Sequence, residues 1–145
     1  MSAELLAAKF LGQLPHALAL GIEVVSVDVA RGACSMRLPW RAELVGDPAQ
    51  EVLHGGVITA LLDSLGAAAV IVRGLYSPAT LDLRIDYLRP ATPRSDLIAE
   101  AECYRTTRHI AFVRGVCHQG DRERPVANLT ATFIFAERTR AAGGV

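Results

Sequence analysis

The segment that runs from His54-Gly55-Gly56 to Asp63 holds the residues best suited to chemistry. Two consecutive glycines let a ligand approach the backbone closely, and the first N–H groups of a helix have no partners within that helix. A helix that starts here suits a carbonyl oxygen, an oxyanion or a phosphate. The same residues also fit a tight turn into a helix, with a packing histidine.

Asp63 is the one ionisable residue in the long apolar run that follows the glycines. An unpaired buried carboxylate costs several kcal/mol or shifts its pKa strongly. At helical spacing Thr59, Asp63 and Gly66 share one face, which gives a narrow stripe of small or polar residues on an apolar helix. The stripe fits a carboxylate that faces a cleft. It equally fits a structural Asp bonded to Thr59, Ser64 or a backbone N–H of a surrounding sheet.

The remaining histidines and the three cysteines form no catalytic or metal-binding pattern. No histidine pair has the spacing of metal ligands, so we expect no metal site. The odd number of cysteines and the lack of a C-x-x-C pair favour buried apolar thiols in a reducing compartment. The G-x-S-x-G, Walker and dinucleotide-binding motifs do not occur. The residues concerned are His16, His109, His118, Cys34, Cys103 and Cys117.

The composition indicates one domain with an apolar core and no charge bias. At 145 residues the chain has the length of a single domain, and 51% of its residues are hydrophobic, enough to bury a core. Lys and Arg number 15, as do Asp and Glu, which argues against a nucleic-acid partner.

Neither apolar segment has the pattern of a targeting or membrane signal. Near the N-terminus Glu4, Lys9 and Pro15 interrupt the apolar residues, which predicts an amphipathic helix in place of a signal peptide. The longest apolar stretch, 61–72, includes Asp63 and is too short to span a bilayer. We therefore expect a cytoplasmic protein without a membrane partner.

Hydrophobic periodicity predicts a helix, two strands, a long helix and four further strands. Pro15 is expected to end the first helix. The long helix is apolar on almost every side, which predicts burial all round at the centre of the domain. The expected bounds are a helix at 3–14 within an N-terminal segment 1–18, strands at 21–30 and 33–40, a loop at 41–53, the long helix at 56–73, strands at 79–88, 96–106, 109–118 and 126–136, and a frayed tail at 138–145.

The order of these elements restricts the architecture. No second long helix separates the later strands, so the sheet must be antiparallel. A single sheet wrapped around one apolar helix satisfies this order and gives one α+β domain over residues 1–145. One helix cannot cover both edges of such a sheet, so we expect the chain to pair with another subunit.

Two stretches of the sequence resemble a known family. HGGVITALLDSLGAAAV at 54–70, followed by TLDLRIDYLRPA at 80–91, resembles the hotdog-fold acyl-CoA thioesterases. The most similar group is the PaaI-like, or phenylacetic-acid-type, group of the 4-hydroxybenzoyl-CoA thioesterase superfamily. The resemblance covers residues 20–137 and implies a hotdog fold, an antiparallel sheet wrapped around one long central helix. It also implies hydrolysis of an acyl- or aryl-CoA to free acid and CoA, without a cofactor because CoA is part of the substrate.

The resemblance implies roles for residues of the first stretch. Asp63 matches the catalytic carboxylate, which acts as a general base for water or as a nucleophile. Gly55 matches the residue whose N–H polarises the thioester carbonyl, with His54 and Gly56 beside it. Gly56 and Ser64 are expected to contact the substrate. In the family the helix start and the carboxylate of one site come from different subunits, which implies a homodimer or homotetramer with sites at the interface.

The second stretch supplies further candidates. By the resemblance Thr80 matches a Ser or Thr that helps to place the water or the carboxylate. Strand alternation groups Thr80 with Asp82 and Arg84, away from the face packed on the chain's own helix. Arg89, together with Arg84 and Arg108, is a candidate for binding the CoA phosphates. The same arginines also fit solvated surface charge.

One position departs from the family pattern. Many relatives carry Asn or Gln six residues before the motif histidine, where this chain has Pro48. Either Asp47 or Gln50 takes over that role in orienting water through a shift of the loop, or the role is absent from this chain.

Two other functions fit parts of the sequence. Gly46-Asp47-Pro48 followed by His54 faintly resembles the G-D-x-N-P-x-H pattern of hotdog acyl-CoA hydratases or dehydratases, without its Asn and with a longer spacing. A non-catalytic acyl-CoA-binding protein would keep the same fold. Release of free CoA thiol from acyl-CoAs distinguishes hydrolysis from hydration and from binding alone.

Overall fold

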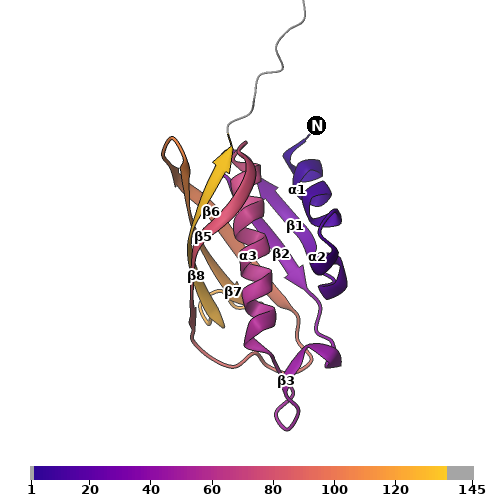
Figure 1. Ribbon diagram of the computed structural model, residues 1–145. Coiled ribbons are helices and arrows are strands. Elements are labelled where there is room, and N and C mark those ends of the chain that lie inside the picture. Colours follow the sequence, from indigo (N-terminus) through magenta and orange to yellow (C-terminus); the bar gives the residue numbers. More distant parts are fainter. Residues whose placement is uncertain (1, 137–145) are drawn as a thin grey trace, which may run out of the picture.

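The computed structural model describes residues 2–136. At its centre the helix α3 lies against a six-stranded antiparallel sheet of order β1-β2-β6-β7-β8-β5 (Figure 1). The expected tail at 138–145 lies outside the described residues. The elements are α1 (Ala3–Gly12), α2 (Pro15–Leu20), β1 (Glu23–Asp28), β2 (Ala33–Leu38), a 3-10 helix (Ala42–Leu44), β3 (Val45–Asp47), β4 (Val52–Leu53), α3 (Gly55–Val72), β5 (Tyr76–Tyr87), β6 (Leu97–Thr106), β7 (Ile110–His118) and β8 (Ala127–Ala136).

The sheet and its helix form the hotdog arrangement, and the expected α+β fold is confirmed. Strands β2, β5, β6, β7 and β8 all contact α3, while α1 packs against both α3 and β1. In Figure 1, α3 stands in front of the sheet, with α1 and α2 beside it near β1. The long helix therefore has the sheet on one side and the N-terminal helices on another.

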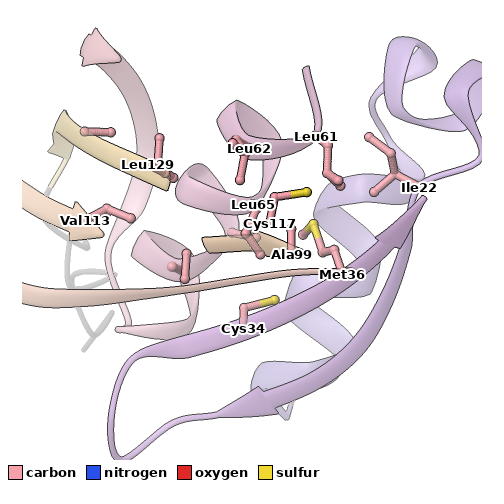
Figure 2. Close-up of a cluster of buried hydrophobic side chains, with 14 of the residues drawn as sticks. Ile22, Cys34, Met36, Leu61, Leu62, Leu65, Ala99, Val113, Cys117 and Leu129 are labelled. Carbon is pink, nitrogen blue, oxygen red and sulfur yellow. The ribbon is translucent and has the colours of Figure 1, made fainter. Parts of the chain in front are cut away.

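Leucines of α3 fill the space between the helix and the sheet. Leu61, Leu62 and Leu65 are fully buried, and Figure 2 shows them among buried side chains from several strands. Gly66 permits a close approach of α3 to the sheet, because a Cβ at that position would lie 2.8 Å from Cζ of Phe133. These contacts determine which face of α3 meets the sheet.

The expected burial of α3 on every side is wrong for the single chain. One stripe of small and aliphatic side chains is only half-buried, since α1 packs on only part of the helix. The stripe consists of Val57, Ala60, Ser64, Ala67 and Ile71.

The whole helix is also longer than the stretch 61–72, and by length and composition it could cross a membrane. Half of it is buried inside the fold, as in the core helix of a globular domain.

Pro15 begins a second helix in addition to ending the first. Helix α1 stops at Gly12, and α2 starts with Pro15 at its first position. Proline is favourable there because its missing N–H would have no partner in the helix and its φ already fits. Gly21 ends α2 in the left-handed conformation, with φ +74°. The single N-terminal helix expected from the sequence is therefore two short helices.

The loop expected at 41–53 contains the 3-10 helix and the two-stranded ribbon β3–β4. Gly46 in β3 lies against the residue that precedes α3, because a Cβ there would be 2.8 Å from Cα of His54. The backbone N–H of His54 donates to the carbonyl of Leu44 at 2.9 Å. The ribbon thus fixes the position of the start of α3.

All three cysteines are free and buried, as the sequence predicts. Burial raises the pKa of Cys34 and of Cys117 to about 12, and it raises the pKa of Cys103 as well. The thiols are therefore neutral near pH 7, and none is suited to act as a nucleophile.

The raised thiol pKa values predict how the free energy of unfolding depends on pH. The neutral buried thiols of Cys34 and Cys117 contribute fully to the free energy of unfolding below the ordinary thiol pKa of 9.0. This contribution is lost as the pH rises toward about 12. In urea denaturation above about pH 9, the variant C34A/C117A should lose less stability with rising pH than the wild type. The slopes of the free energy of unfolding against pH should differ between wild type and variant by up to about 1.4 kcal/mol per pH unit for each thiol. Parallel curves would contradict this, whatever the starting stability of the variant.

Candidate active site

The start of α3 offers one free backbone donor. His54 is the N-cap residue, and its Nδ1 accepts a hydrogen bond from the Gly56 N–H at 2.8 Å. Among the described residues the Gly55 N–H has no hydrogen-bond partner. The expectation that Gly56 also offers its N–H to a ligand is therefore corrected, because the cap occupies that group.

The cap determines the tautomer of His54. A neutral imidazole whose Nδ1 accepts a hydrogen bond carries its proton on Nε2. The side chain is exposed, so this Nε2–H is accessible next to the helix start. The imidazole thus offers a second donor near the start of α3, besides the Gly55 N–H.

The carboxylate of Asp63 is held by Thr80 of β5. Thr80 Oγ1 donates to Asp63 Oδ1 at 2.7 Å, and Asp63 is half-buried. Within residues 2–136 neither Thr59 nor Ser64 bonds to this carboxylate. One oxygen of Asp63 thus has a fixed partner, while the other remains available to water.

The contact between Thr80 and Asp63 overturns the prediction from strand alternation. A β-bulge between Thr80 and Asp82 adds an extra residue, Leu81, to β5 and shifts the register. Thr80 pairs with Phe133, a fully buried residue on the helix-facing side of β8. The prediction that Thr80 lies away from the chain's own helix is therefore wrong, because alternation breaks at the bulge.

Tyr87 contacts the first residue of α3 and was not predicted as a site residue. Its hydroxyl donates to the carbonyl oxygen of Gly55 at 2.9 Å and lies within hydrogen-bond distance of Thr59 Oγ1. Thr59 Oγ1 also lies within hydrogen-bond distance of the Gly55 carbonyl oxygen, at 3.2 Å. Strand alternation places Tyr87 on the helix-facing side, but nothing in the sequence indicates how far its hydroxyl reaches.

A pocket of about 320 Å³ opens beside Gly55. Its walls come from the segment before α3, from α3 itself and from the segment that follows β5. A pocket lined mainly by aliphatic side chains, next to a free N–H, suits a ligand with an apolar chain and a carbonyl group. The aliphatic lining residues are Val52, Leu53, Ile58, Leu88, Pro90 and Ala91.

A larger hollow, of about 410 Å³, lies on the face of the sheet that points away from α3. Five of its six charged side chains form ion pairs, and the sixth, Asp28, accepts the backbone N–H of Arg31. Glu102 binds Arg31 and Arg114, and Glu100 binds Arg122. Because these groups already have partners, we place the candidate site at the start of α3.

The three candidate arginines lie in different places. Arg89 lines the pocket beside Gly55, and its Nε donates to the carbonyl of Pro125 at 3.0 Å. Arg84 pairs with Asp86 at 3.3 Å. Arg108 follows β6 at the end of the sheet opposite to the start of α3. Only Arg89 is close to the candidate site within one chain.

Ser64, Asp47 and Gln50, which the sequence also suggested for the site, make no contact there within the described chain. Ser64 lies on the half-buried stripe of α3 and makes no hydrogen bond within the described chain. Asp47 Oδ1 accepts the N–H of Ala49 at 2.9 Å and so stabilises its own turn, while Gln50 is exposed. Within the described chain neither Asp47 nor Gln50 contacts Gly55 or Asp63.

The sheet, the central helix, the free N–H at its start and the carboxylate along it define a hotdog protein with a candidate site at that helix. Residues 50–126 match the model of the family described as the thioesterase superfamily. The chain belongs to the thioesterase superfamily, and the expected class of enzyme, a thioester hydrolase, is confirmed.

Individual relatives agree with this assignment. The medium/long-chain acyl-CoA thioesterase YigI of Salmonella typhimurium is 29% identical, over 90% of this chain and 92% of that protein. A protein of Halobacterium salinarum named as an esterase is 38% identical over 92 residues, which are 59% of this chain and 58% of that protein. The phenylacetic acid degradation protein PaaI of Thermus thermophilus is 29% identical, with a TM-score of 0.73 over 86% of this chain and 100% of that chain.

The bond from Thr80 to Asp63 predicts a difference between two conservative variants. Thr80→Val keeps the shape and removes the donor, and it should cost about 1 kcal/mol of free energy of unfolding. It should also lower the rate of thioester hydrolysis about tenfold, because about 1.4 kcal/mol of positioning energy corresponds to that factor. Thr80→Ser keeps the hydroxyl and should retain most of the activity. Urea denaturation and steady-state kinetics measure both, and equal rates for the two variants would contradict the assigned contact.

Proposed function

We propose that this chain is an acyl-CoA thioesterase, which hydrolyses an acyl- or aryl-CoA to the free acid and CoA. The observation that carries the proposal is the free Gly55 N–H at the start of α3, together with the carboxylate of Asp63 further along the same helix. The acyl-CoA thioesterase activity named for the Salmonella relative supports the choice of substrate. The apolar pocket beside Gly55 suits the acyl group.

The proposed reaction uses the chain's own residues and water. The Gly55 N–H donates to the thioester carbonyl oxygen, and the partial positive charge of the helix start favours the oxyanion that develops there. Asp63 takes a proton from water as the water oxygen bonds to the carbonyl carbon. The C–S bond then breaks, and the proton passes from Asp63 to the CoA thiolate. The products are one free acid and one CoA thiol.

The distance along α3 supports a site shared between two copies of the chain. Gly55 and Asp63 are eight residues apart, and at about 1.5 Å per residue they are separated by about 12 Å along the helix. A carbonyl group that accepts from Gly55 is therefore out of reach of a water activated by Asp63 of the same helix. We propose a homodimer at least, in which Gly55 of one subunit faces Asp63 of the other.

The edge strand β5 supports this assembly. It lies at one end of the sheet, next to β8, and carries Thr80 and Tyr87, which contact the two ends of the candidate site. Leu81 in β5 is 56% exposed. An unpaired edge with exposed apolar side chains is a favourable surface for pairing with a second copy.

The role of Asp63 is tested by Asp63→Asn, which keeps the volume and removes the charge. Turnover of acyl-CoA should fall by at least about 10²-fold, because the amide cannot accept the proton of water. The fold should survive, since an amide is less costly to desolvate than a carboxylate. Release of CoA thiol, thermal melting and acyl-CoA binding are measured on one preparation. Near-normal turnover by well-folded protein would refute the mechanism, and binding without turnover in the wild type would indicate an acyl-CoA-binding protein.

The shared site is tested by complementation between two inactive variants. Gly55→Pro removes the N–H donor at a helix position that favours proline, and the extended His54 (φ −62°, ψ 134°) is compatible with it. When this variant is co-expressed in equal amounts with Asp63→Asn, about half of the dimers hold one chain of each kind. Each mixed dimer has one intact site, so about a quarter of the wild-type activity should return.

Co-expression of Asp63→Asn with Asp63→Ala is the matched control, and it should restore nothing. If Gly55 and Asp63 acted from the same chain, the first mixture would also remain inactive.

A further inference from the structure

We propose that Tyr87 is a positioning residue that fixes the Gly55–Gly56 peptide at the start of α3 and thereby restrains Gly55, whose own N–H meets the thioester carbonyl. The proposal rests on the function proposed above and adds a residue from β5 to that site. Its basis is the bond from the Tyr87 hydroxyl to the Gly55 carbonyl at 2.9 Å, with Thr59 Oγ1 beside both atoms.

The hydrogen bonds of this cluster can be counted. A carbonyl in a helix ordinarily accepts one bond, from the N–H four residues further on. The Gly55 carbonyl is approached by two hydroxyl groups besides, and each hydroxyl has one proton. One proton therefore goes to the carbonyl, and the other links Tyr87 to Thr59. The shorter contact, 2.9 Å against 3.2 Å, makes Tyr87 the donor to the carbonyl and Thr59 the donor to Tyr87.

This arrangement holds the Gly55–Gly56 peptide at both of its polar groups. On the far side of the peptide bond, the Gly56 N–H donates to His54 Nδ1 at 2.8 Å. The Tyr87 ring also covers the residue, since a Cβ on Gly55 would lie 3.5 Å from Tyr87 Cε1. The N–H of Gly55 is the backbone group of this turn that remains free within residues 2–136.

A glycine at the first position of a helix needs such support. Without a Cβ its backbone samples more conformations than any other residue, and a donor stabilises an oxyanion best when it is already oriented. The hydroxyl of Tyr87 fixes the Gly55–Gly56 peptide and so narrows the backbone conformations open to Gly55, which limits how far its N–H, on the neighbouring peptide, can turn. Its loss should weaken interactions that form in the transition state more than binding of the ground state, so kcat should fall while KM changes little.

The test is Tyr87→Phe, which keeps the ring over Gly55 and removes the hydroxyl. We expect kcat for acyl-CoA hydrolysis to fall about tenfold, less than the roughly 10²-fold typical for loss of an oxyanion donor, with KM within about twofold. The pH profile of kcat should keep its shape, because the proposed base, Asp63, is unchanged. Tyr104→Phe, the same change at an exposed tyrosine of β6, is the matched control and should leave kcat unchanged.

A purely structural role gives a different result. In that case Tyr87→Phe would lower the melting temperature while the folded enzyme kept its kcat, and the proposal would be overturned. A changed pH profile would also overturn it, since Tyr87 would then take part in proton transfer. Asp63→Asn is measured alongside. If Asp63→Asn is inactive and Tyr87→Phe is fully active, only the role of Tyr87 fails, whereas an active Asp63→Asn removes the proposed function itself.

Discussion

The packing of α3 against the sheet is the constraint on which the candidate site depends. The helix must be apolar to lie there, and Leu61, Leu62 and Leu65 supply the buried surface. The small Gly66 lets the helix approach Phe133 closely. This approach places the face of α3 that carries Thr59, Asp63 and Gly66 against β5 and β8. A carboxylate on that face needs a polar partner from the sheet. The carboxylate is thus tolerated because the sheet offers the hydroxyl of Thr80 at that point.

The edge strand β5 supplies the partners of both Asp63 and Gly55. The different spans of strand and helix explain why one partner is a threonine and the other a tyrosine. From Thr80 to Tyr87 a strand of seven steps covers about 23 Å, whereas eight residues of helix cover about 12 Å. A short side chain on β5 can therefore contact α3 directly at Asp63, while at Gly55 the contact requires a long side chain that reaches back. Tyrosine supplies that reach and ends in a hydroxyl, so it can bond to a backbone carbonyl.

The sequence predicts the helix, the later strands and the locations of Gly55 and Asp63, because apolar periodicity and glycine pairs are local signals. It does not predict the side on which Thr80 lies, since a single extra residue at Leu81 reverses the alternation. Nor does it predict that His54 uses the Gly56 N–H, because a side-chain cap depends on one rotamer. The reach of the Tyr87 hydroxyl depends on the distance between helix and strand, which only the packing determines.

The separation of about 12 Å between Gly55 and Asp63 also links assembly to activity in the proposed mechanism. Because the two groups of one site would come from different chains, any change that weakens association would lower activity without touching either group. The bulge at Leu81 lies on the exposed edge of β5 and at the same time turns Thr80 toward Asp63. The local geometry of this edge strand would therefore affect both the orientation of the carboxylate and the surface available to a second copy. Selection on catalysis and selection on assembly would thus act on the same few residues of β5.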